Sequence, residues 1–219
     1  TSERIFKIAS LMHYYELDKG MTLARQSNSK DVLINVKRDN IKLNAYSTLQ
    51  DKFNLLNVPV YAEMILGLPG ESYISWKNGL DELLETGLNN QLFVYQAEVY
   101  PNTELGTKDY QKKFGIVTKK TQINEIHCSP RKQKWLEEFQ EIVIQTNTMS
   151  ISDWRKMTIY SIFTMLLHSM KLGFFILSYL HYRHNIKYSE LLESIIDSKT
   201  PFISELIALY NLYLDGLLD

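Results

Sequence analysis

The sequence predicts a chain that is α/β in its first part and all-α in its second. Three short runs rich in apolar and β-branched residues, at residues 21–27, 58–66 and 91–99, alternate with helical stretches. From about residue 126 onward the pattern is nearly pure helix. Alternation of strand and helix at this spacing is typical of βαβ units with a parallel sheet. We therefore expect an α/β domain over residues 1–125 and a helical domain over residues 126–219.

Each element of the first part has a local signal. The run at residues 58–66 is the clearest strand, and Gly67 to Gly70 breaks it. The expected helices lie at the start of the chain, from residue 28 or 29, at residues 46–56 and at residues 71–85, the last ended by Gly87. Three strands alone would leave two open sheet edges, which proteins avoid. We therefore expect further strands upstream of residue 1, and an exposed sheet edge at residues 21–27.

Five helices are expected in the second part, at residues 131–146, 150–173, 174–182, 188–196 and 201–218. Thr200-Pro201 is a strong helix start, because Pro fits the first helical position and Thr can cap it. Residues 157–180 are the most apolar, but His168 and Lys171 leave charge-free runs shorter than the roughly 20 residues of a membrane span. We therefore expect a buried helix pair there and no membrane span.

The composition argues against several classes of protein. Lys+Arg 24 against Asp+Glu 25 gives a net charge of −1, which offers no general attraction to nucleic acid. Cys128 is the single cysteine, so an internal disulfide is excluded and a reducing, cytoplasmic location is expected. One thiol is also too few to hold an iron–sulfur cluster. The pairs His127-Cys128 and His181/His184 have no further partner that indicates a catalytic or metal site, and we name no catalytic residue and no metal ligand.

Two polar residues stand out in the expected strands. Glu63 lies in the middle of an apolar run, where a buried carboxylate without a partner would cost several kcal/mol. It therefore lines a site or has a structural ion pair, for which Arg25 or Arg38 would serve. Gln26 ends the first strand, and the C-terminal ends of parallel strands build the active sites of α/β barrels. Together Gln26 and Glu63 suit the recognition of a sugar diol, although either could satisfy loop backbone groups.

Three segments match a known family in order and spacing. They are Gln26-Ser27 with Arg38 twelve positions after Gln26, the run EMILGLPGE that begins at Glu63, and Tyr100-Pro-Asn-Thr103. This ordered set resembles the second half of a radical S-adenosylmethionine (SAM) barrel over residues 19–115. The resemblance implies the C-terminal half of a (βα)6-type partial TIM barrel, followed by a helical C-terminal domain. The CxxxCxxC loop of that family, which supplies the cluster ligands, is absent from this sequence, so the chain resembles a fragment that lacks the N-terminal half.

The resemblance also implies roles for individual residues. Gln26 and Glu63 would hold the ribose hydroxyls of SAM, and Arg38 would meet its methionine carboxylate. The turn Gly67-Leu68-Pro69 after the second strand would run alongside the adenine and the methionine moiety of SAM. The implied SAM-binding residues are Gln26, Ser27, Arg38, Glu63, Gly67, Leu68 and Pro69. The sequence departs from the family pattern at Glu63, where Asp is commoner, and at Arg25, where a small or apolar residue is usual.

Residues 19–23, 40–43 and 89–92 most resemble radical SAM proteins with an N-terminal cobalamin-binding domain. This implies SAM, a [4Fe-4S] cluster and cobalamin as cofactors, with the ligands of the last two outside this chain. It further implies a small-molecule substrate, an electron donor and radical chemistry such as methyl transfer, while the isolated chain would be inactive. The alternatives are a non-catalytic helical interaction module on a decayed α/β remnant, and a non-radical (βα)-barrel enzyme that uses Glu63 as acid or base.

Overall fold

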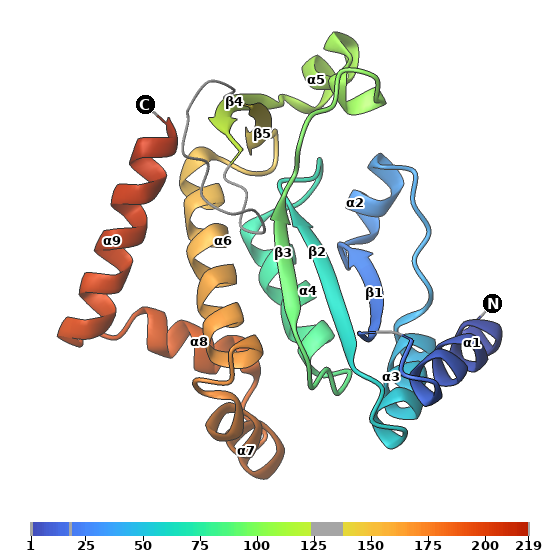
Figure 1. Cartoon of the computed structure of the whole chain (residues 1–219). Coiled ribbons are helices and arrows are strands. Elements are labelled where there is room, and N and C mark those ends of the chain that lie inside the picture. Colours follow the sequence, from blue (N-terminus) through green and yellow to red (C-terminus); the bar gives the residue numbers. More distant parts are fainter. Residues whose placement is uncertain (1, 18, 124–137, 219) are drawn as a thin grey trace, which may run out of the picture.

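The computed structural model of the chain describes residues 2–17, 19–123 and 138–218. These residues form a mixed α/β unit followed by helices, as predicted (Figure 1). The strands are β1 (Met21–Gln26), β2 (Val60–Leu66), β3 (Leu92–Gln96), β4 (Val117–Gln122) and β5 (Phe139–Gln145). The α-helices are α1 (Ser2–Tyr14), α2 (Lys30–Asn35), α3 (Leu43–Leu55), α4 (Tyr73–Leu84), α5 (Lys108–Phe114), α6 (Ile151–Thr164), α7 (Phe174–His184), α8 (Tyr188–Ile196) and α9 (Pro201–Leu218).

The three predicted strands form one parallel sheet in the order β1-β2-β3. In its register Ala24 of β1 lies opposite Glu63 of β2, and Glu63 lies opposite Phe93 of β3. Among the described residues β1 pairs with β2 alone, so its other edge carries no strand. This is the exposed edge that the sequence predicts.

The hydrophobic core lies on one face of this sheet. Alternate residues of β2 are fully buried, as at Ala62 and Met64, because strand side chains point to opposite faces. Trp76 and Leu80 of α4 belong to the same buried cluster, which continues through α6, α8 and α9. Trp76 Nε1 also donates a hydrogen bond to Ser161 Oγ at 2.9 Å. The sheet and the helices of the second part thus share one core, and the boundary between residues 125 and 126 stays a prediction.

The prediction of a helix at residues 131–146 is wrong for residues 139–145. These residues form β5, which pairs antiparallel with β4, while residues 131–137 lie outside the described ranges. β5 also bonds the chain after β3, from Val143 N to Ala97 O at 2.8 Å and from Val99 N to Glu141 O at 2.8 Å. The run of Ile142, Val143 and Ile144 fits a strand, and its tertiary pairing decides the conformation. The antiparallel pair β4–β5 and the short helix α5 were not predicted from the sequence.

The helices of the second part otherwise begin and end close to their predicted positions. Ser150 caps α6 through the backbone N–H of Asp153, whose carboxylate accepts in return from Ser150 N. After Thr164 the helix continues as a π-helical turn, Met165–Ser169. Within the ranges described, no single helix is long and apolar enough to cross a membrane. Taken together, the helical segments Ile151–Ser169 and Phe174–His184 have the length and apolar composition of a membrane span, but the chain bends by 91° between them.

The Asp81 side chain connects α4 to the start of α8 through hydrogen bonds. Its buried carboxylate accepts hydrogen bonds from Ser189 N at 3.0 Å and Ser189 Oγ at 2.9 Å. Replacing Asp81 by Ala leaves these buried donors without an acceptor, so the free energy of unfolding should fall by about 1–3 kcal/mol. Urea denaturation measures this loss. Asn78→Ala, at an exposed position of α4, should change it by less than about 0.5 kcal/mol, and equal effects of the two changes would contradict the role of Asp81.

Candidate functional site

The face of the sheet opposite the core carries the candidate site. Tyr61, Glu63 and Ile65 of β2 alternate with the buried residues and are only partly buried. On β3 their neighbours are Phe93 and Tyr95, which are 38% and 50% exposed. The Phe93 ring lies 6.3 Å from that of Tyr61 and 6.3 Å from that of Tyr95, between centroids. In the part of the chain that the structure describes, this face is therefore an open aromatic surface around one carboxylate.

The Glu63 carboxylate has no polar partner in residues 2–17, 19–123 and 138–218. No hydrogen bond or ion pair joins it to Arg25, Arg38 or any other described side chain. A structural ion pair with either arginine, the alternative that the sequence left open, is therefore wrong for these residues. Burial and, second, the charge of Glu63 raise the pKa of Tyr95, which places the carboxylate beside that phenol. Glu63 is thus available to a ligand that approaches the open face.

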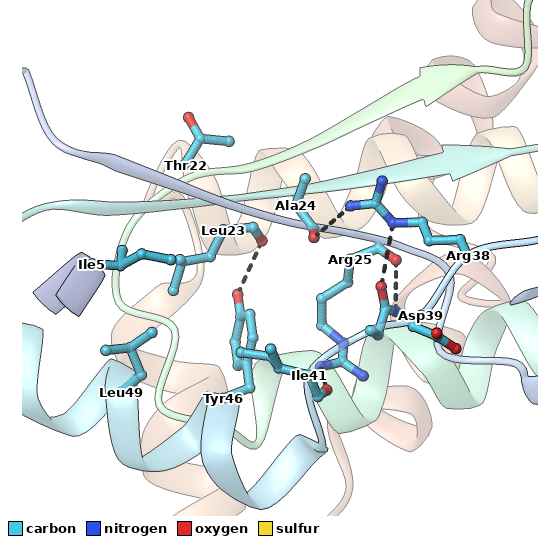
Figure 2. Close-up of a pocket in the computed structure, with 11 residues that line it drawn as sticks. Ile5, Thr22, Leu23, Ala24, Arg25, Arg38, Asp39, Ile41, Tyr46 and Leu49 are labelled. Carbon is cyan, nitrogen blue, oxygen red and sulfur yellow. Dashed lines mark hydrogen bonds between the residues drawn. The ribbon is translucent and has the colours of Figure 1, made fainter. Parts of the chain in front are cut away.

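The two arginines lie on different sides of β1 (Figure 2). Arg25 is buried, and its guanidinium donates to Asn28 Oδ1 and to Ile41 O and lies over the Tyr46 ring, 5.1 Å from the centroid. Its charge is used in packing α3 and the following loop against the strand.

Arg38 reaches the strand from the other side. Its Nη2 lies 3.4 Å from Ala24 O, and Figure 2 shows its guanidinium on the side to which the Ala24 side chain points. Because Ala24 is the register partner of Glu63, Arg38 and Glu63 belong to the same face and are separated by one strand. The Arg38 guanidinium therefore lies at the outer edge of β1, whereas the Arg25 guanidinium packs against α3.

A pocket of about 340 Å³ follows the free edge of β1 (Figure 2). It is lined by Ile5, Thr22, Leu23, Ala24, Arg25, Arg38, Asp39, Asn40, Ile41, Tyr46 and Leu49. Along its wall the carbonyl of Leu23 accepts from the Tyr46 hydroxyl at 3.4 Å, and Ala24 O accepts from Arg38. Both bonds are long, so these strand carbonyls are weakly satisfied. The pocket lies where a further strand could pair with β1.

Gln26 ends β1 in a strained conformation. Its φ of 61° lies in the left-handed region, where the register shifts between Ala24 and Gln26. A non-glycine residue adopts this conformation at a cost of about 1–2 kcal/mol. The Gln26 amide makes no hydrogen bond with the described residues, and its register partner Met64 follows Glu63 directly. Gln26 thus lies one register position beyond the pair Ala24–Glu63, and neither the Gln26 nor the Glu63 side chain makes a hydrogen bond with the described residues.

Ser27 belongs to a buried network of loops. Its hydroxyl donates to Glu71 Oε2 at 2.6 Å, and both residues are almost fully buried. Ser75 Oγ donates to the other carboxylate oxygen of Glu71, and Thr148 Oγ1 donates to Glu71 O at 2.7 Å. Glu71 therefore joins the loops that follow β1, β2 and β5. In the sequence Glu71 is only the last residue of the EMILGLPGE run, and its burial depends on Ser27 and Thr148, which lie far from it along the chain.

The turn after β2 packs against the chain's own elements. Gly67 has a φ of 99°, and a Cβ added there would lie 3.2 Å from Val143 O of β5, so only glycine fits without strain. Leu68 and Pro69 are buried, and Pro69 O accepts from Asn35 Nδ2 at 3.0 Å. This turn fixes the rim of the sheet at the end where Gln26 and Glu71 also lie.

No protein-family model matches the sequence, but two characterised proteins do. The 2-(S-pantetheinyl)-carbapenam-3-carboxylate methyltransferase of Streptantibioticus cattleyicolor is 32% identical over 195 residues, which are 88% of this chain and 28% of the relative. The cobalamin-dependent radical SAM methyltransferase TokK of Streptomyces tokunonensis is 32% identical over 198 residues, 90% of this chain and 29% of the relative. This chain is homologous to cobalamin-dependent radical SAM methyltransferases. It spans less than a third of the length of each of these relatives.

A solved structure also aligns with the chain. It is the radical SAM methyltransferase TsrM of Kitasatospora setae with tryptophan and a SAM analogue bound, at 9% identity and a TM-score of 0.46. The alignment covers 69% of this chain and 32% of TsrM.

A radical SAM enzyme holds its iron–sulfur cluster through several cysteine thiolates. The described residues contain no group of three His, Cys, Asp or Glu side chains that could hold a metal ion. His168 is buried, its Nε2 lies 2.8 Å from Leu88 O, and burial lowers its pKa to about 4, so the ring is neutral and packed into the core. His127 and Cys128 lie outside the described residues. The described part of this radical SAM homologue therefore does not fit the cluster.

The Glu71 network predicts a pH dependence of stability. Burial raises the pKa of Glu71 above its ordinary value of 4.5, and the hydrogen bonds from Ser27, Ser75 and Ser72 lower it only in part. Between the ordinary and the raised value the folded state binds more protons than the unfolded state, so the free energy of unfolding falls as the pH rises. Glu71→Gln cannot ionise and should lack this slope, which is at most about 1.4 kcal/mol per pH unit.

Urea denaturation of both proteins between about pH 4 and pH 7 measures the difference. The stability of Glu71→Gln relative to the unchanged protein should rise across this range. Parallel curves would contradict a buried, ionising Glu71.

Proposed function

We propose that this chain is the C-terminal part of a cobalamin-dependent radical SAM methyltransferase and supplies half of its SAM pocket. The observation that carries the proposal is the Glu63 carboxylate, which stands without a partner among the described residues on the open face of a parallel sheet. A half-buried charge of this kind is costly unless a ligand uses it. Homology to two enzymes of this class supports the choice of ligand.

Three residues have the chemistry that SAM requires. The two oxygens of Glu63 would accept from the ribose hydroxyls, and the Gln26 amide, which both donates and accepts, would complete the diol contact. The Arg38 guanidinium, on the same face, would pair with the methionine carboxylate. Phe93 and Tyr95 would provide apolar walls beside Glu63. When bound, SAM supplies the radical and methyl-transfer chemistry for which the relatives are named.

The other half of the pocket would come from outside this chain. The free edge of β1 and the pocket beside it suit a further parallel strand, which would extend the sheet toward a (βα)6-type barrel. The cluster ligands and the cobalamin-binding domain would belong to that missing N-terminal half, as would the contact with an electron donor. The substrate would be a small molecule, and the protein would work in the cytoplasm. Helices α6 to α9 would form the helical part behind the sheet.

The DNA upstream of the region that encodes this chain tests the proposal. We expect the same reading frame to encode a CxxxCxxC loop, and the protein with that loop to cleave SAM under anaerobic, reducing conditions. A complete reading frame without the motif would contradict the proposal. It would favour a non-catalytic module or, if activity needs no reductant, a non-radical barrel enzyme.

A further inference from the structure

Helix α7 carries an apolar face that the described residues leave open to solvent. Leu177 on its inner side is buried, whereas Phe175, Ile176, Tyr179 and Tyr182 are 60–78% exposed. At 100° per residue these four share one outward face. The preceding loop adds Met170 and Leu172, 65% and 71% exposed. An exposed apolar patch of this kind usually marks a contact surface, so this face is expected to have a partner.

The ionisable groups of α7 and of the residues that flank it include basic side chains and no carboxylate. The eleven residues of α7 include no Asp or Glu, and Arg183 and His184 lie in its last turn. Lys171 precedes the helix and Lys187 follows it. The first acidic residue after α7 is Glu190 of α8. A second copy of the chain would bring like charges together across a two-fold axis, whereas an anionic surface would complement them.

We propose that α7 binds the surface of an anionic lipid bilayer. Aromatic side chains with a polar tip, such as Tyr179 and Tyr182, suit the boundary between headgroups and acyl chains. Eleven helical residues span about 16 Å, about half of the roughly 30 Å hydrocarbon core, so α7 lies in the interface and does not cross it. Basic residues beside an apolar face are the pattern of such interfacial helices.

The position of α7 keeps the candidate SAM site free. Ser169, just before α7, accepts a hydrogen bond through its Oγ from the backbone N–H of Leu92, the first residue of β3. Helix α7 therefore lies near the N-terminal ends of the strands. Gln26 and the Gly67 turn lie at the opposite, C-terminal ends. Figure 1 shows α7 at the end of the molecule remote from β4 and β5. Lipid contact through α7 would therefore leave that rim exposed, and it does not depend on the proposed SAM chemistry.

Vesicle sedimentation of the 219-residue chain tests the proposal. Vesicles of phosphatidylcholine with phosphatidylglycerol should bind the chain about ten-fold or more better than pure phosphatidylcholine. Phe175→Ser should weaken this binding by about ten-fold or more, because the apolar contact is lost. Phe202→Ser on α9 is the matched control, since Phe202 is 72% exposed and Phe175 is 78% exposed. It should leave binding unchanged.

A second change separates charge from apolar contact. Arg183→Glu should weaken binding to the anionic vesicles by about five-fold or more and leave any binding to phosphatidylcholine unchanged. Circular dichroism should show the same helix content for all variants. Absence of binding to either vesicle, or an equal loss in Phe202→Ser, would overturn the proposal. So would a dimer in light scattering that Phe175→Ser dissociates, because a second copy would then cover the face.

Discussion

Replacing Glu63 by Ala in a protein that carries this chain together with a cluster-binding half is expected to weaken SAM binding by about 10- to 100-fold. A hydrogen bond to a charged group contributes about 1.5–3 kcal/mol, which corresponds to this range. The side chain forms no hydrogen bond or ion pair with the described residues, so its loss should not disturb the fold. Isothermal titration of the anaerobic protein with SAM gives the affinity, and urea denaturation gives the stability of both proteins.

Two further variants make the Glu63 prediction specific. Glu63→Asp keeps the carboxylate and introduces the residue that is commoner in radical SAM proteins, so it should keep most of the affinity. Glu190→Ala removes an exposed carboxylate from α8, remote from the open face, and should have no effect. An unchanged affinity in Glu63→Ala would place SAM elsewhere. A loss of affinity accompanied by an equal loss of stability would point to a structural role for Glu63.

By itself the 219-residue chain is expected to hold neither an iron–sulfur cluster nor SAM. Its single cysteine cannot replace the several thiolates that a cluster needs, and the described residues offer no other group of metal ligands. Gln26, Arg38 and Glu63 would supply a few hydrogen bonds of about 0.5–1.5 kcal/mol each, or somewhat more where charged. These contacts must offset an association cost of about 4–15 kcal/mol before any affinity is seen.

The parts of the fold that depend on local pattern could be predicted from the sequence. The apolar, β-branched run that contains Val60 and Ile65 forms β2, and Pro201 begins α9. A carboxylate in an apolar strand predicts a site or an ion pair at Glu63, and among the described residues Glu63 forms no hydrogen bond or ion pair. Its role, like those of Gln26 and Arg38, stays a prediction. The open edge of β1 is predicted because the sequence contains three parallel strands, fewer than the six of the barrel that it resembles.

Features that depend on distant partners could not be predicted. The helical character of the neighbouring segments predicts a helix at residues 139–145, but pairing with β4 and with the chain after β3 makes them a strand. Glu71 gains its role from Ser27, which lies 44 positions earlier in the chain. The family motif predicts that Ser27 binds SAM, yet its hydroxyl donates a hydrogen bond to Glu71 inside the loop network. The exposed face of α7 is also a tertiary feature, since its sequence alone indicates burial.

Anaerobic reconstitution of this chain with iron and sulfide, followed by titration with SAM in a calorimeter, tests the central claim most directly. The chain is proposed to carry half of a SAM pocket and none of the cluster ligands. The expected result is no cluster absorbance and no measurable heat of SAM binding from the 219 residues alone, with both restored once the half that carries CxxxCxxC is present. A stoichiometric cluster, or micromolar SAM binding by this chain alone, would contradict the claim.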